Sequence, residues 1–226
     1  MHVRCTKPKT YPVIKACIFD LDGVIVDTAH YHFLAWKRLA DELGVAFTET
    51  ENERLKGVSR MDSLEIILEL GKIKLDVKTK QALADKKNVW FVDYVNTMKA
   101  DEIFPGVKDL LKKIRSKGVK VGLASSSKNA GRVIELLKIE KEFDVIVDGT
   151  MVVNSKPDPE IFLLAASKLK IAPKECLVFE DAEAGVEAAI TAGMKCIGVG
   201  SKDQLSKANV VYAKTGDFKL ELLNSL

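Results

Sequence analysis

Two aspartates, Asp20 and Asp22, stand at the end of an apolar run, directly before Gly23. Side chains alternate between the two sides of a strand, so residues two apart point the same way and these carboxylates are expected close together. Paired carboxylates repel each other, and an apolar strand end seldom keeps them without a metal ion or a shared proton. The plain alternative is an Asp-Gly turn that merely ends a strand, and the dipeptide alone favours it.

A second acidic pair, Glu180 and Asp181, follows the apolar run 176–179 in the same arrangement. Parallel strands bring their carboxyl ends to one edge of a sheet, so this pair is expected beside Asp20 and Asp22. Taken alone, a Glu-Asp pair is more often a solvated loop. Together the carboxylates predict an oxygen-rich site for Mg²⁺, which prefers a few protein oxygens and keeps positions open for water and phosphate.

Hydroxyl and ammonium groups follow two further segments. Ser125 opens the polar run 125–129, which offers hydroxyls and helix-start amides to an anion. Lys156 precedes Pro157, whose fixed backbone torsion holds the chain before a helix. A serine run is usually a helix cap, and a lone lysine is usually solvated. In combination with the four carboxylates, however, these groups indicate Mg²⁺-dependent phosphoryl transfer with Asp20 as the nucleophile.

The elements that must position these groups alternate between strand and helix. Short apolar runs predict strands over 13–19, 119–124, 143–147, 176–179 and 195–199, with a weak last strand over 210–213. Amphipathic stretches predict helices over 107–116, 130–137, 159–169, 184–192 and 220–226. The alternation predicts an α/β fold, a Rossmann-like parallel sheet covered by helices.

Residues 29–98 break this rhythm, because they contain only helical patterns. We predict that they form an inserted α-helical bundle, a cap domain, with helices over 31–43, 62–70 and 79–97. Residues 1–28 and 99–226 then form the core domain. The cap is expected over the carboxyl ends of the strands, where open α/β sheets place their active sites.

Composition narrows the class of protein. The 226 residues are 47% hydrophobic, and the net charge of +3 is spread along the chain, so no nucleic-acid partner is indicated. Residues 1–12 lack the apolar stretch of a secretory signal, and no segment approaches the roughly 20 apolar residues of a membrane helix. Cys17, Cys176 and Cys196 lie in apolar runs and Cys5 in the leader. We therefore predict a cytoplasmic protein with reduced, buried thiols and no membrane partner.

The motifs resemble those of a known family. The segments 20–24, Ser125, 156–157 and 180–181 match, in order, the four motifs of the haloacid dehalogenase (HAD) superfamily. This resemblance covers nearly the whole chain. Within the superfamily the sequence is similar to the β-phosphoglucomutases, and the cap and core segments that carry this similarity are 27–29, 31–33, 35–37, 55–60, 62–64, 87–88 and 124–129.

The resemblance implies that Asp20 exchanges a phosphoryl group with a sugar hydroxyl, while Asp22 acts as general acid and base. It implies that Ser125 and Lys156 hold the transferring group. The implied metal is Mg²⁺, bound by Asp20, the backbone carbonyl of Asp22, Glu180 and Asp181. The implied reaction interconverts β-glucose 1-phosphate and glucose 6-phosphate through β-glucose 1,6-bisphosphate, in a monomer that binds small sugar phosphates.

The resemblance also implies a sugar site and a second phosphate site. Arg60 would grip the phosphate that is not reacting, and His32 and Thr28 would serve the hinge. The expected substrate-binding residues are Thr28, His32, Trp36, Leu55, Gly57, Val58, Ser59, Arg60, Ser63, Lys87, Ser126, Ser127, Lys128 and Asn129. Simpler interpretations exist, because His32 and Trp36 lie four apart and suit helix packing, and Arg60 and Lys87 suit a solvated surface.

Two rival functions share these motifs. A cap-bearing sugar- or polyol-phosphate phosphatase would use the same Asp20 intermediate. The cap loop 56–60 favours the mutase, together with Ser127 and Asn129, because a simple phosphatase has less need of a second phosphate site. A silent sugar-phosphate sensor is the other rival, and it would have no reason to retain the whole set of Asp20, Asp22, Lys156 and Asp181.

Overall fold

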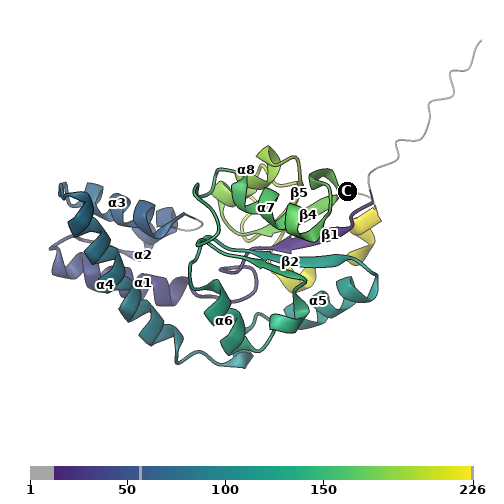
Figure 1. Cartoon of the computed structure of the whole chain (residues 1–226), viewed down its shortest axis with the longest axis horizontal. Coiled ribbons are helices and arrows are strands. Elements are labelled where there is room, and N and C mark those ends of the chain that lie inside the picture. Colours follow the sequence, from purple (N-terminus) through teal and green to yellow (C-terminus); the bar gives the residue numbers. More distant parts are fainter. Residues whose placement is uncertain (1–12, 56–57, 225–226) are drawn as a thin grey trace, which may run out of the picture.

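The computed structural model describes residues 13–55 and 58–224. A parallel six-stranded sheet, in the order β3-β2-β1-β4-β5-β6, forms the centre of the larger domain, which confirms the predicted α/β fold (Figure 1). Its strands are β1 (Ala16–Phe19), β2 (Lys120–Ala124), β3 (Val145–Val147), β4 (Cys176–Glu180), β5 (Lys195–Val199) and β6 (Val210–Tyr212). Since β1 pairs with both β2 and β4, the carboxyl ends of these three strands lie side by side.

Alternation of buried side chains along β1 explains why helices cover both faces of the sheet. Cys17 and Phe19 belong to one hydrophobic cluster with α5 (Val107–Ser116) and α6 (Ala130–Leu137). Ala16 and Ile18 belong to another with α7 (Glu160–Leu169) and α8 (Glu183–Thr191). Figure 1 shows these two helix pairs on opposite sides of the sheet.

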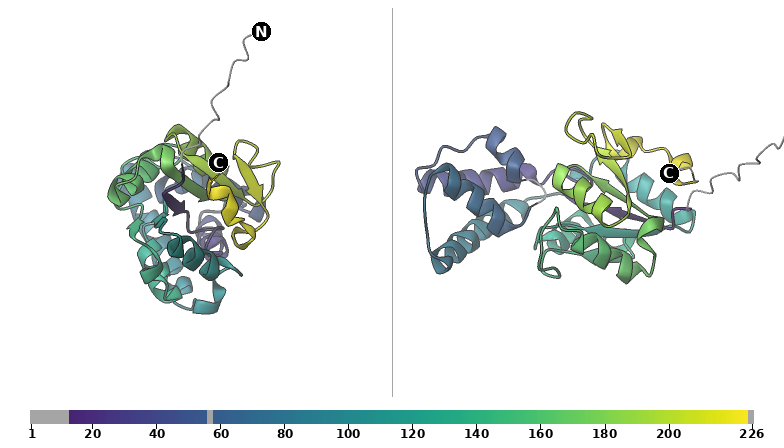
Figure 2. Two further views of the ribbon diagram at one scale, coloured as in Figure 1. Left: turned by 90° about the vertical axis from the view of Figure 1, so that its right-hand side faces the viewer. Right: turned by 90° about the horizontal axis from the view of Figure 1, so that it is seen from above.

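The cap is a separate helical bundle with its own hydrophobic core (Figure 2). Its helices are α1 (Ala29–Glu42), α2 (Glu49–Asn52), α3 (Arg60–Leu70) and α4 (Val77–Val95). The two chain segments that join it to the core touch each other, because the Phe104 amide donates to the Ile25 carbonyl oxygen over 3.0 Å. We propose the predicted positions, between residues 28 and 29 and between 98 and 99, as the domain boundaries.

The observed elements differ from the predicted ones mainly at their ends. The first strand begins at Ala16 rather than at Val13, which is 58% exposed. The short helix α2 and the 3₁₀ turn Glu53–Leu55 were not predicted, because one turn carries too little periodicity. The last helical segment is a 3₁₀ helix over Leu220–Asn224, and positions 225–226 lie outside the described residues.

Burial of the thiols supports the prediction made from their apolar surroundings. Cys17, Cys176 and Cys196 are free and fully buried, and loss of hydration raises the pKa of each thiol. A raised pKa means less thiolate at pH 8, and the thiolate is the reactive form. Among the described residues no helix is long and apolar enough to cross a bilayer.

A Cys5→Ser variant tests this thiol chemistry, because it leaves only the three buried cysteines. We expect far less than one equivalent of a thiol reagent to react with the folded variant at pH 8, and all three thiols to react in denaturant. A colorimetric disulfide reagent provides the measurement. Fast stoichiometric labelling of even one thiol in the native protein would contradict the packing described here.

Candidate active site

A buried triad of charges lies at the carboxyl ends of β1 and β4. The Lys156 Nζ donates to Asp20 Oδ1 over 2.6 Å and also to Glu180 Oε1. The side chain of Lys156 is completely buried, and that of Asp20 is 6% exposed. Burial alone would lower the pKa of Lys156, but the two carboxylates outweigh it and the net pKa is raised, so the ammonium stays charged.

The two aspartates of the β1 turn differ in proton affinity. Burial raises the pKa of Asp20 to about 6, with Lys156 opposing and Glu180 adding to the rise. Burial and then the charge of Asp20 raise the pKa of Asp22 to about 8. At neutral pH Asp20 is therefore mainly the anion and Asp22 mainly the acid. An ionised Asp20 beside a protonated Asp22 suits a nucleophile next to a proton donor.

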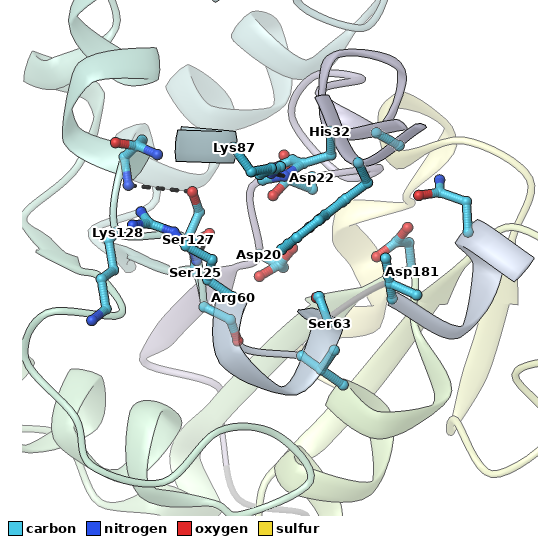
Figure 3. Close-up of a pocket in the computed structure, with 17 residues that line it drawn as sticks. Asp20, Asp22, His32, Arg60, Ser63, Lys87, Ser125, Ser127, Lys128 and Asp181 are labelled. Atoms are coloured by element: carbon cyan, nitrogen blue, oxygen red, sulfur yellow. Dashed lines mark hydrogen bonds between the residues drawn. The ribbon is translucent and has the colours of Figure 1, made fainter. Parts of the chain in front are cut away.

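Asp181 lies against the turn that follows Asp20. Gly23 has a φ of 71°, and a Cβ there would stand 2.1 Å from Asp181 Oδ2, so only glycine permits this approach. The carboxylates of Asp20, Asp22 and Asp181 all line one pocket. Figure 3 shows Asp20 between Asp181 on one side and Ser125 and Ser127 on the other.

The oxygen-rich pocket fits Mg²⁺ only if backbone and solvent contribute. Within the described ranges, no three His, Cys, Asp or Glu side chains gather closely enough to hold a metal ion. The carboxylates of Asp20 and Asp181 are hard oxygen donors beside the backbone of Asp22, and Mg²⁺ retains several waters or phosphate oxygens. The donor set therefore suits an open Mg²⁺ site rather than a closed side-chain cage.

Glu180 does not line this pocket, because its carboxylate lies against Lys156. Its Oε1 accepts from Lys156, and its Oε2 accepts from the Ala182 amide over 2.9 Å. The carboxylate folds over Gly185, where a Cβ would lie 1.9 Å from Oε1. The structure therefore shows Glu180 holding Lys156, and its role as a metal ligand stays a prediction.

The tight approach at Gly185 leads to a testable prediction. We expect Gly185→Ala to displace the Glu180 carboxylate from Lys156 and to lower kcat by about 10- to 100-fold, the cost of about 1.4–3 kcal/mol of misplaced charge. Steady-state kinetics provide the measurement. Gly131→Ala in α6 is the matched control, because nothing lies within 4 Å of the Cβ it would add.

Shortening the displaced side chain offers a second check on that prediction. Adding Glu180→Asp to Gly185→Ala removes one methylene and vacates the space that the new methyl group needs. We expect this double variant to recover part of the lost kcat. Equal kcat values for Gly185→Ala and the parent enzyme would show that Glu180 does not control Lys156.

The segment after β2 supplies hydrogen-bond donors and hydroxyls. Ser125 is buried, and its Oγ accepts from the Ser127 amide over 3.2 Å. The Ser127 Oγ in turn accepts from the Asn129 amide over 3.3 Å, immediately before α6. The loop 125–129 packs closely against Gly149, since a Cβ on Gly149 would lie 2.2 Å from the Ser126 carbonyl oxygen. The loop is thus shaped to hold an anion near Asp20.

The cap contributes a buried amine. Lys87 on α4 is 1% exposed, its Nζ lies 2.9 Å from His32 Nδ1, and it stands 4.4 Å from the Trp36 ring centroid. Burial and then nearby Arg60 lower the pKa of Lys87 well below its usual value. Burial and then the charge of Lys87 lower the pKa of His32 well below its usual value, which favours the neutral ring beside the Lys87 amine. A bound phosphate beside Lys87 and Arg60 would favour the charged form of the Lys87 amine.

One pocket brings together most of the residues that the sequence suggested, from both domains. The predicted residues that line it are Asp20, Asp22, His32, Trp36, Leu55, Val58, Arg60, Ser63, Lys87, Ser125, Ser126, Ser127, Lys128, Asn129 and Asp181. Lys156 and Glu180 lie buried behind Asp20. Gly57 lies outside the described residues.

Two predicted residues fall outside the pocket wall. Thr28 is 1% exposed at the start of α1, and its Oγ1 has no hydrogen-bond partner among the described residues. Ser59 caps the N-terminus of α3 by accepting from the Asp62 amide. Both positions therefore belong to the framework around the pocket rather than to its surface.

Sequence reasoning missed two polar residues. Asn52, 8% exposed on α2, lines the pocket. Asn88 accepts from Asn129 Nδ2 over 2.8 Å and so links α4 to the core. The sequence around Asn52 carries no signal for this role, whereas the position of Asn88 directly after Lys87 could have suggested it.

Comparison with known proteins agrees with this arrangement. The haloacid dehalogenase-like hydrolase family matches residues 14–193. The chain is 45% identical to the β-phosphoglucomutase of Bacillus subtilis over 93% of this chain and 94% of that protein. It is 39% identical to a phosphorylated carbohydrates phosphatase of Thermotoga maritima, covering 81% of this chain and 84% of that protein.

A solved structure shows the same architecture. The crystal structure of β-phosphoglucomutase from Clostridium difficile is 43% identical, with a TM-score of 0.91 over 94% of this chain and 96% of that chain. Identity and coverage at this level extend through the cap as well as the core. The chain therefore belongs to the haloacid dehalogenase-like hydrolase family and, within it, to the β-phosphoglucomutases.

Proposed function

We propose that this chain interconverts β-glucose 1-phosphate and glucose 6-phosphate through β-glucose 1,6-bisphosphate. The observation that carries the proposal is a single pocket with phosphate-binding groups from both domains, Ser125 and Lys128 from the core and Arg60 and Lys87 from the cap. A bisphosphate that reacts at either end needs a second phosphate site.

The proposed chemistry begins with a phosphoryl group on Asp20. The sugar hydroxyl oxygen bonds to phosphorus while the Asp20 oxygen–phosphorus bond breaks, and Asp22 accepts the hydroxyl proton. The bisphosphate then turns round, and Asp20 attacks its other phosphate. Asp22 returns the proton to the departing sugar oxygen. Its pKa of about 8 allows Asp22 to serve in both directions near neutral pH.

We propose that Asp20, Asp181 and the backbone carbonyl of Asp22 would hold Mg²⁺. The ion, when bound, would neutralise charge on the phosphoryl oxygens. Lys156 supplies a fixed positive charge beside Asp20 in a water-poor site, where such charges stabilise a transition state without reorganisation. We further propose a cytoplasmic location, which the buried unpaired thiols support. The monomeric state stays a prediction.

A phosphatase is the second candidate, favoured by the 39% identity to the phosphorylated carbohydrates phosphatase of Thermotoga maritima. In that reaction water, rather than a sugar hydroxyl, would attack the phosphoryl group on Asp20. The cap cations Arg60 and Lys87 argue against it, because they provide a binding site for a group that does not react.

One assay separates the two candidates. We expect the protein, given β-glucose 1-phosphate, Mg²⁺ and a trace of β-glucose 1,6-bisphosphate, to form glucose 6-phosphate faster than inorganic phosphate. A coupled dehydrogenase assay and a phosphate assay measure the two products. Inorganic phosphate without glucose 6-phosphate would identify a phosphatase.

A further inference from the structure

A hydrogen bond joins the cap to the core outside the pocket wall. The Ser155 hydroxyl donates to Asp62 Oδ2 over 2.6 Å, although the two residues are 93 positions apart. Asp62 lies in the first turn of α3, and Ser155 lies in the core directly before Lys156. Both residues border a second cavity, and Arg60 and Lys128 line this cavity as well as the substrate pocket.

Two hydroxyls converge on the same carboxylate oxygen. Besides Ser155, the Ser59 hydroxyl donates to Asp62 Oδ2 over 2.6 Å, and the Ser59 Oγ accepts from the Asp62 amide over 3.2 Å. Hydroxyl-to-carboxylate bonds of this length are charge-assisted and stronger than neutral ones. Asp62 thus holds Ser59, the N-cap residue directly before Arg60, which is the first residue of α3.

The core side of the bond is also fixed. The Glu160 carboxylate accepts from the amides of Val153 and Asn154 over 3.1 and 2.8 Å, and the Ser155 carbonyl oxygen accepts from the Asp158 amide over 3.0 Å. The segment therefore presents Ser155 at a defined place. The next residue is Lys156, whose ammonium contacts Asp20.

We propose that Asp62 is a positioning residue that latches the cap onto the core through Ser155. The inference rests on the proposed function. Closing this bond places Arg60, beside one end of the latch, over the pocket while Lys156, beside the other end, stays at the nucleophile. A closed pocket excludes water, which would otherwise compete with the sugar for the phosphoryl group on Asp20.

Five variants test the latch: Asp62→Ala, Asp62→Asn, Ser155→Ala, the double variant Asp62→Ala with Ser155→Ala, and Asp76→Ala as the matched control. Asp76 caps α4 in the same domain and accepts from the Thr79 amide over 2.9 Å and its hydroxyl over 2.8 Å. Its loss therefore reproduces the loss of a helix cap without touching the core. Asp62→Asn is a conservative variant, because it retains one acceptor oxygen but no charge.

We expect Asp62→Ala and Ser155→Ala each to lower kcat/KM about 5- to 10-fold and to raise the fraction of turnover that releases inorganic phosphate. The double variant should be no worse than Asp62→Ala, because both changes break one bond. The kcat/KM of Asp62→Asn should lie between that of the parent and that of Asp62→Ala. Asp76→Ala should lower thermal stability and leave the product ratio unchanged.

A closure measurement does not depend on which reaction the protein catalyses. Spin labels at Val89→Cys, an exposed position in the middle of α4, and at Lys202→Cys in the core, in a Cys5→Ser background, report the interdomain distance in the free protein. We expect broader distance distributions in both latch variants than in the parent or in Asp76→Ala.

The outcomes separate the latch from the proposed function. If the parent forms no glucose 6-phosphate while the latch variants broaden the distance distribution, the proposed function fails and the latch stands. If the parent is a mutase but the latch variants change neither the distances nor the product ratio, the latch is overturned. Additive losses from Asp62→Ala and Ser155→Ala would overturn it as well.

Discussion

Asp20→Asn is expected to lower mutase activity by at least about 10⁴-fold, because an amide oxygen is a poor nucleophile and cannot carry the phosphoryl group. Asparagine has nearly the same size as aspartate, so the pocket keeps its shape. The same change removes one of the two carboxylates that face Lys156, and Glu180 remains as its partner. The variant is therefore expected to fold.

Phosphoryl transfer to the protein gives the sharper measurement. When the parent enzyme is mixed with β-glucose 1,6-bisphosphate that carries labelled phosphoryl groups, the chain should become labelled transiently, and hydroxylamine should remove the label. Asp20→Asn should take up no label. Asp101→Asn, an exposed carboxylate in the core, is the matched control and should retain parental activity. Parental turnover by Asp20→Asn would refute the assignment of the nucleophile.

Lys156→Met is expected to cause the largest loss of stability among these variants. The change leaves the carboxylates of Asp20 and Glu180 buried without their shared ammonium. Breaking a buried ion pair by removing one partner costs about 3–5 kcal/mol. Denaturant unfolding measures it, and Lys168→Met on the exposed side of α7 is the control.

The pH dependence of this loss has a definite sign. Asp20 already has a pKa of about 6 in the folded protein, above the unfolded value of about 3.9, so its contribution to stability is full below about pH 4 and declines as the pH rises through 6. Without Lys156 the folded pKa rises further. Between about pH 5 and 8, the free energy of unfolding of Lys156→Met should therefore fall more steeply than that of the parent.

A second substitution distinguishes stability from chemistry. Adding Glu180→Gln to Lys156→Met removes one of the uncompensated charges, and we expect it to restore much of the lost stability. Activity should stay low, because the positive charge beside Asp20 is still missing. Recovery of activity together with stability would show that Lys156 acts only as a structural counter-ion.

The sequence determined the frame of the protein and the place of its chemistry. Apolar runs identified the five principal strands, and Asp20, Ser125 and Glu180 were located at or just after their ends, because strand periodicity and turn residues are local properties. The helical pattern of residues 29–98 likewise predicted the cap. Motif order then connected these positions to a family, a connection that the comparisons confirmed.

Only the tertiary structure decided which partner each of two neighbouring carboxylates contacts. Glu180 and Asp181 are adjacent in sequence, yet the first contacts the buried Lys156 and the second lines the pocket. The space above Gly185 and the space beside Gly23 set these directions. Such choices depend on which backbone lies opposite, and local sequence does not contain that information.

Contacts between cap and core were equally beyond the sequence. Asp62 has the pattern of an ordinary helix-cap residue, and Ser155 that of a loop serine, until the folded domains place their side chains 2.6 Å apart. Burial of Lys87 follows from the packing of α4 against α1, which sets it beside His32. Local periodicity specifies elements, whereas the proton affinity and the partner of each site residue depend on the surroundings that distant segments supply.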